Sequence, residues 1–133
     1  MADTVTVRKF FEGTRRFAVH LTGISDGTGE TAVVKVSKAA LLANDDGEAV
    51  SRIVIDEITW SVDGHAYVNL LWDHTTDQEI AVLERSGYKS FLEFGGLVDP
   101  NTAGGTGDII LTVGTPVAGG SYDILLNCRK KYD

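Results

Sequence analysis

Apolar and polar residues alternate with a period of two along most of the chain. In residues 16–23, RFAVHLTG, the side chains of Phe17, Val19 and Leu21 share one face of an extended strand, and polar side chains dominate the other. The same alternation recurs in residues 65–73, 108–114 and 121–130. Strands that bury one face and expose the other are typical of antiparallel sheets packed against each other.

Weaker patterns predict further strands at residues 4–11, 31–37, 53–62, 79–84 and 88–94. The Asp-Gly pair within Val62–His65 predicts a hairpin with a type I′ turn. Only residues 37–45, SKAALLAND, indicate a helix of one or two turns, with Ser37 as its N-cap. We therefore predict one all-β domain over residues 1–133, an antiparallel β-sandwich or a small jelly-roll-like barrel with one short helix.

The charge of the chain argues against a nucleic-acid partner. Twelve basic and nineteen acidic residues give a formal net charge of −7, and an acidic surface repels phosphate groups. Basic residues nevertheless cluster at Arg15–Arg16 and at Arg129–Lys131, either as solvated strand ends or as a contact with an acidic protein neighbour. No apolar run has the length of a signal peptide or a membrane span, so we expect synthesis in the cytosol and no membrane partner.

The glycine-rich stretch GGLVDPNTAGGTGDIILTV, residues 95–113, invites a phosphate or calcium interpretation. A phosphate loop needs a lysine and a following helix, whereas here Gly107 is followed by Asp108 and a predicted strand. GGTGDIIL resembles a fragment of a calcium-binding nonapeptide repeat, but only one copy is present. Turns rich in Asp, Gly and Thr form without a metal, so the pattern favours a corner over a calcium site.

The residues that usually carry metal or thiol chemistry are scattered. His20, His65 and His74 fall in polar positions or turns, and none pairs with another at metal-ligand spacing. Cys128 is the only cysteine, so no internal disulfide can form, and its apolar phase predicts a buried thiol. We predict no metal site and no cofactor.

No arrangement of nucleophiles or carboxylates predicts catalysis. The adjacent residues Asp56 and Glu57 should point to opposite faces of a strand, which excludes them as a glycosidase pair. We therefore predict no catalytic residues.

Two aromatic features remain. Trp60 and Trp72 follow the apolar phase of their strands, which favours core packing over a ligand platform. Consecutive strand residues face opposite ways, so either Phe10 or Phe11 needs a second partner surface, such as a neighbouring subunit.

Four stretches taken together resemble a family of small tailed-bacteriophage virion proteins: GISDGTGETAVVKVSKAAL, LLWDHTTDQEIAVL, GGLVDPNTAGGTGDIILTVG and YDILLNCRKK. The four stretches are spread over most of the chain, between residues 23 and 131, and the resemblance implies a non-enzymatic structural protein. The role it implies first is capsid decoration, or cement, on the exterior of the virion and in contact with the major capsid protein. It also implies a homo-oligomer, with a trimer expected. A connector, collar or tail component is the alternative, and a carbohydrate- or calcium-binding β-module is a more distant one.

Exposure and residue type suggest which side chains make such contacts. The expected interface residues are Phe10, Phe11, Arg15, Arg16, Asp99, Pro100, Asn101, Arg129, Lys130 and Lys131.

Overall fold

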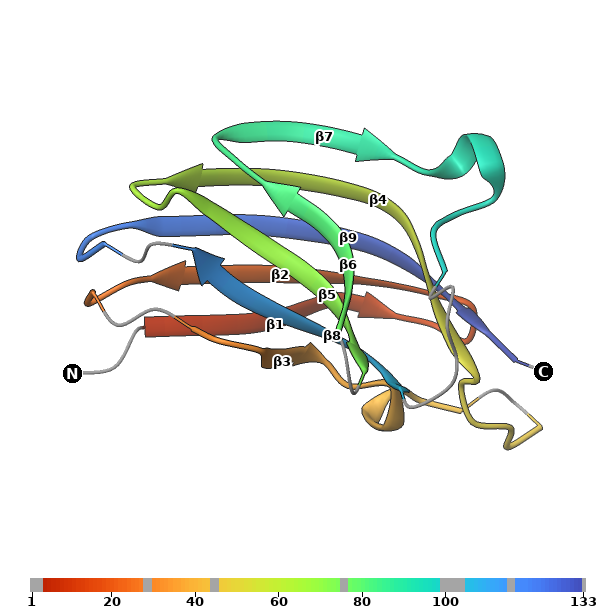
Figure 1. The fold of residues 1–133 in the computed structure, drawn as a ribbon. Coiled ribbons are helices and arrows are strands. Elements are labelled where there is room, and N and C mark those ends of the chain that lie inside the picture. The colour runs from red at the N-terminus through yellow and green to blue at the C-terminus, as the bar shows by residue number, and fades with distance from the viewer. Residues whose placement is uncertain are drawn as a thin grey trace.

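The computed structural model describes residues 4–27, 30–43, 46–74, 77–98, 105–114 and 117–132. Two antiparallel sheets pack face to face (Figure 1). Sheet A has the strand order β1 (Thr4–Glu12), β2 (Arg16–Ile24), β9 (Ser121–Lys131), β4 (Arg52–Asp63) and β7 (Ser86–Ser90). Sheet B has the order β3 (Val33–Val36), β8 (Gly105–Gly114), β5 (Tyr67–His74) and β6 (Gln78–Leu83). Two short 3-10 helices complete the described elements, η1 (Lys38–Ala40) and η2 (Leu92–Phe94).

The predicted alternation defines the core between the sheets. On β2 the inward residues Phe17, Val19 and Leu21 are almost fully buried, and they pack with inward residues of β9 such as Ile124. Trp72 of β5 is 2 % exposed in the same cluster. Removing apolar side chains of this size from water is the main term that stabilises the fold. The prediction of an all-β sandwich is confirmed.

The tryptophans pack as predicted. Trp72 lies inside the core, and Trp60 is partly buried against it. The indole N–H of Trp60 donates a hydrogen bond of 3.0 Å to the carbonyl of Glu84. A Cβ atom at Gly87 would lie 2.5 Å from the Trp60 ring, so glycine at this position makes room for the indole.

The hairpin predicted at Val62–His65 is wrong. The chain does turn there, and Gly64 has a φ of +85°, which favours glycine. However, β4 already has β9 on one side and β7 on the other, which leaves no free edge for β5. The turn therefore carries the chain from sheet A to sheet B.

The helix predicted over residues 37–45 is confirmed only in part, as the single 3-10 turn η1 that follows Ser37. Ser37 makes no side-chain capping bond, and the chain returns to an extended conformation at Leu41. Two tertiary contacts explain this. Leu41 is buried in the core, and a carboxylate oxygen of Asp108 accepts the backbone N–H of Lys38 at 2.8 Å.

The segment predicted as a strand over residues 88–94 splits into two elements. Strand β7 ends at Ser90, and η2 follows and ends at Gly95, whose φ of +84° is left-handed.

No helix in the described parts of the chain is long and apolar enough to cross a bilayer.

Candidate interaction surface

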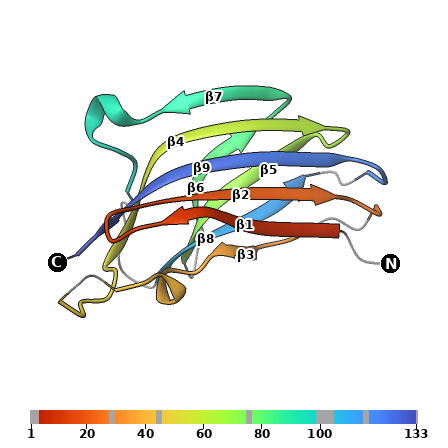
Figure 2. The ribbon, with the colours of Figure 1, turned by 180° about the vertical axis from the view of Figure 1, so that it is seen from behind.

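The outer face of sheet A is turned away from sheet B and is largely open to solvent (Figure 2), although the η2 loop contacts one end of it. Paired residues of neighbouring strands point to the same face of a sheet, so the register defines rows across it. One row of the outer face consists of Phe11, Ala18, Asn127, Glu57 and Ser90.

A β-bulge places both phenylalanines on this outer face. The register of β1 against β2 shifts between Lys9 and Phe11, so Phe10 is the extra residue. The Phe10 ring lies 5.2 Å from the ring of His20, whose imidazole contacts the exposed Asp123. The prediction that Phe10 and Phe11 face opposite ways is therefore wrong. They lie on one surface and are 53 % and 52 % exposed.

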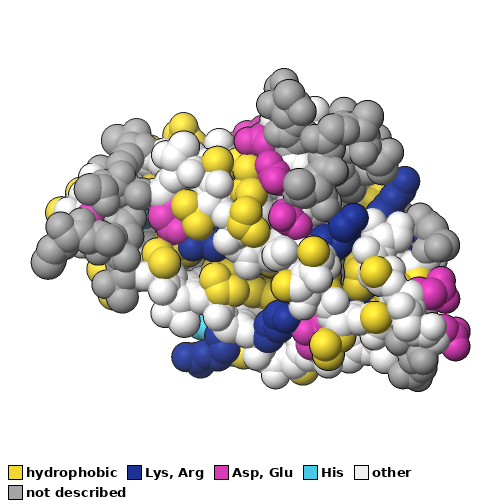
Figure 3. Space-filling model, turned by 90° about the horizontal axis from the view of Figure 1, so that it is seen from below, with side chains coloured by type: hydrophobic (Ala, Val, Ile, Leu, Met, Phe, Trp, Pro, Cys, Tyr) yellow, Lys and Arg dark blue, Asp and Glu magenta, His cyan; other side chains and the backbone are white. Residues whose placement is uncertain are grey.

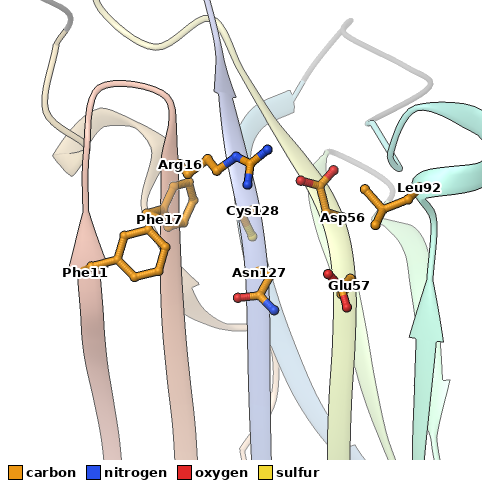
Figure 4. Close-up of a pocket in the computed structure, with 8 residues that line it drawn as sticks. All are labelled: Phe11, Arg16, Phe17, Asp56, Glu57, Leu92, Asn127 and Cys128. Carbon is orange, nitrogen blue, oxygen red and sulfur yellow. The ribbon is translucent and has the colours of Figure 1, made fainter.

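A hollow of about 300 Å³ lies beside Phe11 on the same face (Figure 4). Its lining residues are Phe11, Arg16, Phe17, Asp56, Glu57, Leu92, Asn127 and Cys128. The predicted burial of the Cys128 thiol is confirmed, since this residue is 2 % exposed. Burial raises the pKa of Cys128 above its usual value, and the negative charge of Asp56 adds to the shift, so the thiol stays protonated at neutral pH.

A second bulge, between Ile55 and Glu57 of β4, brings Asp56 and Glu57 to the hollow together. The prediction that these carboxylates point to opposite faces is therefore wrong. Each already has a partner. The Arg129 Nε lies 2.9 Å from both oxygens of Asp56, and Glu57 accepts a hydrogen bond from the Tyr88 hydroxyl.

The loop after η2 completes the Arg129 site. An Arg129 NH2 group donates to the carbonyl of Gly95. Gly96 has a φ of +101°, and a Cβ atom there would overlap the Val54 side chain and lie 2.8 Å from the Arg129 guanidinium. On the other side of the hollow, the hydrogen bond from the Tyr88 hydroxyl to Glu57 raises the pKa of Tyr88.

The fold brings the two basic clusters of the sequence to the same end of sheet A. Arg16 of β2 is directly opposite Arg129 of β9, and Arg52 of β4 is opposite Lys131. The backbone carbonyl of Arg15 accepts the N–H of Lys130 at 2.6 Å. The side chains of Arg15, Arg16 and Lys131 are exposed, and that of Arg129 is half-buried.

Lys130 does not belong to this surface, and its expected exposure is wrong. Its side chain is 0 % exposed, because Lys130 continues the inward phase of β9. The ammonium lies 2.6 Å from Glu12 Oε2 and donates to the Leu42 carbonyl at 3.1 Å. Although burial alone would raise the pKa of Glu12, hydrogen bonds from Lys130, Lys9 and the Leu42 amide lower it to about 2.

The remaining predicted contacts, Asp99, Pro100 and Asn101, lie outside the described residues. The end of the glycine stretch is described as part of β8. There Gly107 has a φ of +79° and packs against the side chain of Lys38.

Sequence reasoning missed a buried charged group at the opposite end of the sandwich. Lys35 lies 2.5 Å from Glu30, which also accepts the hydroxyl of Tyr122. A register shift between Val34 and Val36 marks Lys35 as a bulge residue. The only signal in the sequence is a lysine inside the apolar segment TAVVKVS.

On the side of the molecule formed by the edge strands β1 and β3, exposed hydrophobic side chains lie among polar and charged ones (Figure 3). Val5 and Val7 follow the inward phase of β1 but are 40 % and 46 % exposed, and Val33 on β3 is also exposed. Figure 3 shows hydrophobic side chains along the middle of this side. The sandwich is therefore less completely closed here than in its centre.

Within the described residues, no group of three or more His, Cys, Asp or Glu side chains is arranged to hold a metal ion. No protein-family model matches the chain, and neither a curated protein nor a solved structure matches it. The candidate surface is therefore defined by the geometry of sheet A alone.

Proposed function

We propose that this chain is a non-enzymatic structural protein of a tailed-bacteriophage virion, a capsid decoration protein that binds the assembled head lattice and stabilises it. The resemblance of four sequence stretches to small virion proteins suggests the particle. The outer face of sheet A supplies a surface suited to docking on another protein. The partner in this proposal is the major capsid protein, on the exterior of the head, after synthesis in the host cytoplasm.

The observation that carries the proposal is the aromatic pair Phe10 and Phe11, half-exposed on the same face of a sheet. Aromatic and arginine side chains are enriched in protein interfaces, where an apolar centre is surrounded by a polar rim. Here Phe11 lines the same hollow as the exposed Arg16, and the exposed Arg15 precedes Arg16 in the chain. The bulge turns both rings outward while β1 remains paired with β2 on either side of it, which positions the rings on a scaffold strand.

A decoration role also accounts for the balance of charge. The net charge of −7 favours solubility of the free protein, while the basic end of sheet A provides a local site for an acidic protein surface. Many copies on a symmetric lattice then gain avidity from individually weak contacts. We propose a homo-oligomer, a trimer, as the bound form, with contacts to protein rather than to nucleic acid or membrane.

A co-sedimentation assay tests the docking face. Purified heads lacking the protein are mixed with the wild type or with a Phe10→Ser/Phe11→Ser variant, and the bound fraction is measured. Val117→Ser is the matched control, because Val117 is also an exposed apolar residue but lies outside sheet A. We expect the double variant to lose at least about tenfold in affinity, as for an interface hot spot, and the control to bind normally. Equal binding by all three proteins would contradict the proposed face.

A connector, collar or tail component is the alternative within the same class. The stoichiometry on the particle separates the two roles, because a connector is present in ring numbers at one vertex and a decoration protein covers the head. Binding of a carbohydrate or calcium by the isolated protein would support the more distant alternative, a β-module with a small ligand.

A further inference from the structure

Arg16 is the arginine that lines the hollow beside Phe11, and the neighbouring Arg129 pairs with Asp56, a carboxylate of the same hollow. Arg16 and Arg129 are directly opposite each other on β2 and β9. The Arg129 Nε–H is shared between the two oxygens of Asp56, at 2.9 Å from each. No ion pair joins Arg16 to another residue in the part of the chain that the structure describes.

The side chains around Arg16 form a site with distinct walls. Figure 4 shows the Arg16 side chain extending over β9 toward Asp56, with Phe11 on one side and Leu92 on the other. The amide of Asn127 lies in the same hollow. The site therefore combines a cationic fork, an amide that can donate, and two apolar walls.

The second carboxylate of the hollow limits the ligand. Glu57 accepts the hydroxyl of Tyr88, which ties it to β7 on the side away from Arg16. With Asp56 and Glu57 both present, a doubly charged phosphate meets two negative groups and only one unpaired cation. A single carboxylate matches the planar fork of one arginine and adds less repulsion.

We propose that this hollow receives a carboxylate side chain of the partner protein, with Arg16 as its ion-pair partner and Asn127 as a second donor. The apolar walls then contact the hydrocarbon part of that side chain or of its neighbour. The inference rests on the proposed function, because the partner is the protein surface on which sheet A docks.

The first test uses the free protein and a matched pair of small probes, N-acetylphenylalanine and its amide. Both carry a ring that can stack on Phe11, and only the acid carries a carboxylate. We expect the acid to shift the NMR signals of the Arg16 side chain and the Asn127 amide in a saturable way. The amide should produce at least about tenfold weaker binding, which is typical of losing a charge-assisted hydrogen bond. Equal binding of acid and amide, or no saturable shift with either, would overturn the inference.

The second test uses head binding and three arginine variants. Arg16→Gln removes the charge, Arg16→Lys keeps the charge without the fork, and Arg85→Gln is the control for net charge at an exposed arginine before β7. We expect Arg16→Gln to weaken binding about tenfold and to flatten its salt dependence. Arg16→Lys should recover part of the affinity, and the control should behave as wild type.

The outcomes separate the two proposals. If the wild type binds heads and Arg16→Gln binds equally well, the carboxylate inference fails and the decoration role stands. If the wild type does not bind heads, the decoration role fails, and the probe titration still decides whether the hollow takes a carboxylate.

Discussion

The Lys130 ammonium on β9 lies 2.6 Å from the Glu12 carboxylate on β1, which joins the last strand of the chain to the first. Both side chains point inward at one end of the sandwich, beyond the last apolar residues of the core. Lys9 and the Leu42 amide also donate to Glu12, at 2.8 and 2.6 Å. This group fixes the position of edge strand β1, which carries Phe10 and Phe11.

The Glu12 site predicts a pH-dependent contribution to stability. The folded-state pKa of Glu12 is about 2, below its reference value of 4.5, so the ion pair stabilises the fold above pH 4.5. This contribution is lost progressively as the pH falls from 4.5 toward 2. Urea unfolding of the wild type and Glu12→Gln should show a difference of about 2 kcal/mol at pH 7 that narrows below about pH 4.5. A difference independent of pH would contradict the assignment.

Truncating Lys130 alone should be more damaging than replacing both partners. Lys130→Met leaves Glu12 buried without its main cation and should lower the free energy of unfolding by about 3 kcal/mol at neutral pH. The double variant Glu12→Gln/Lys130→Met removes the unpaired charge and should recover part of that loss. A double-mutant cycle by urea denaturation measures the coupling, and a coupling near zero is the contradictory result.

Alanine substitutions at two neighbouring glycines distinguish destabilisation by backbone strain from destabilisation by steric overlap. Gly95 has a φ of +84°, and a Cβ atom added there would have nothing within 4 Å, whereas a Cβ atom at Gly96 would meet Val54 and the Arg129 guanidinium. We expect Gly95→Ala to cost about 1 kcal/mol of stability and Gly96→Ala to cost clearly more. Thermal unfolding provides the comparison, and equal losses would show that the contact with Arg129 does not constrain this loop.

Reactivity of Cys128 reports on the floor of the hollow. Because this thiol is buried and its pKa is raised, a thiol reagent should label the protein only after unfolding. Labelling is followed by mass spectrometry with and without denaturant. Rapid labelling of the native protein would mean that the hollow opens to the core.

Trp72→Ala tests the buried position of the indole. Trp72 is 2 % exposed, so truncation should cost about 3–5 kcal/mol and could unfold the protein. Phe11→Ala, at a half-exposed ring on the outer face, should change stability by less than about 1 kcal/mol. An intact, stable Trp72→Ala variant would contradict the core assignment.

The sequence predicted the sandwich because its strongest patterns are local. The alternation of β2 and of β9 needs only the side-chain period of two, and the structure follows it closely. The Asp-Gly turn before β5 was also readable. The sheet to which β5 belongs cannot be predicted from this turn, because it depends on β4 having β9 and β7 as its two neighbours.

The candidate surface was less predictable because bulges create it. One extra residue at Phe10 and one at Asp56 shift the phase of each strand, which brings Phe11 and Glu57 into a single row with Asn127. The sequence carries no clear mark of either insertion. Lys130 was misplaced for a different reason: its partner Glu12 is remote in sequence, so its charge alone suggested the surface.

Immunogold labelling of intact virions tests the central claim most directly. The decoration role predicts gold particles spread evenly over the head. Label confined to one vertex or to the tail would contradict decoration and indicate a connector or tail component. The absence of label from particles, with the antigen present in infected cells, would contradict a virion role altogether.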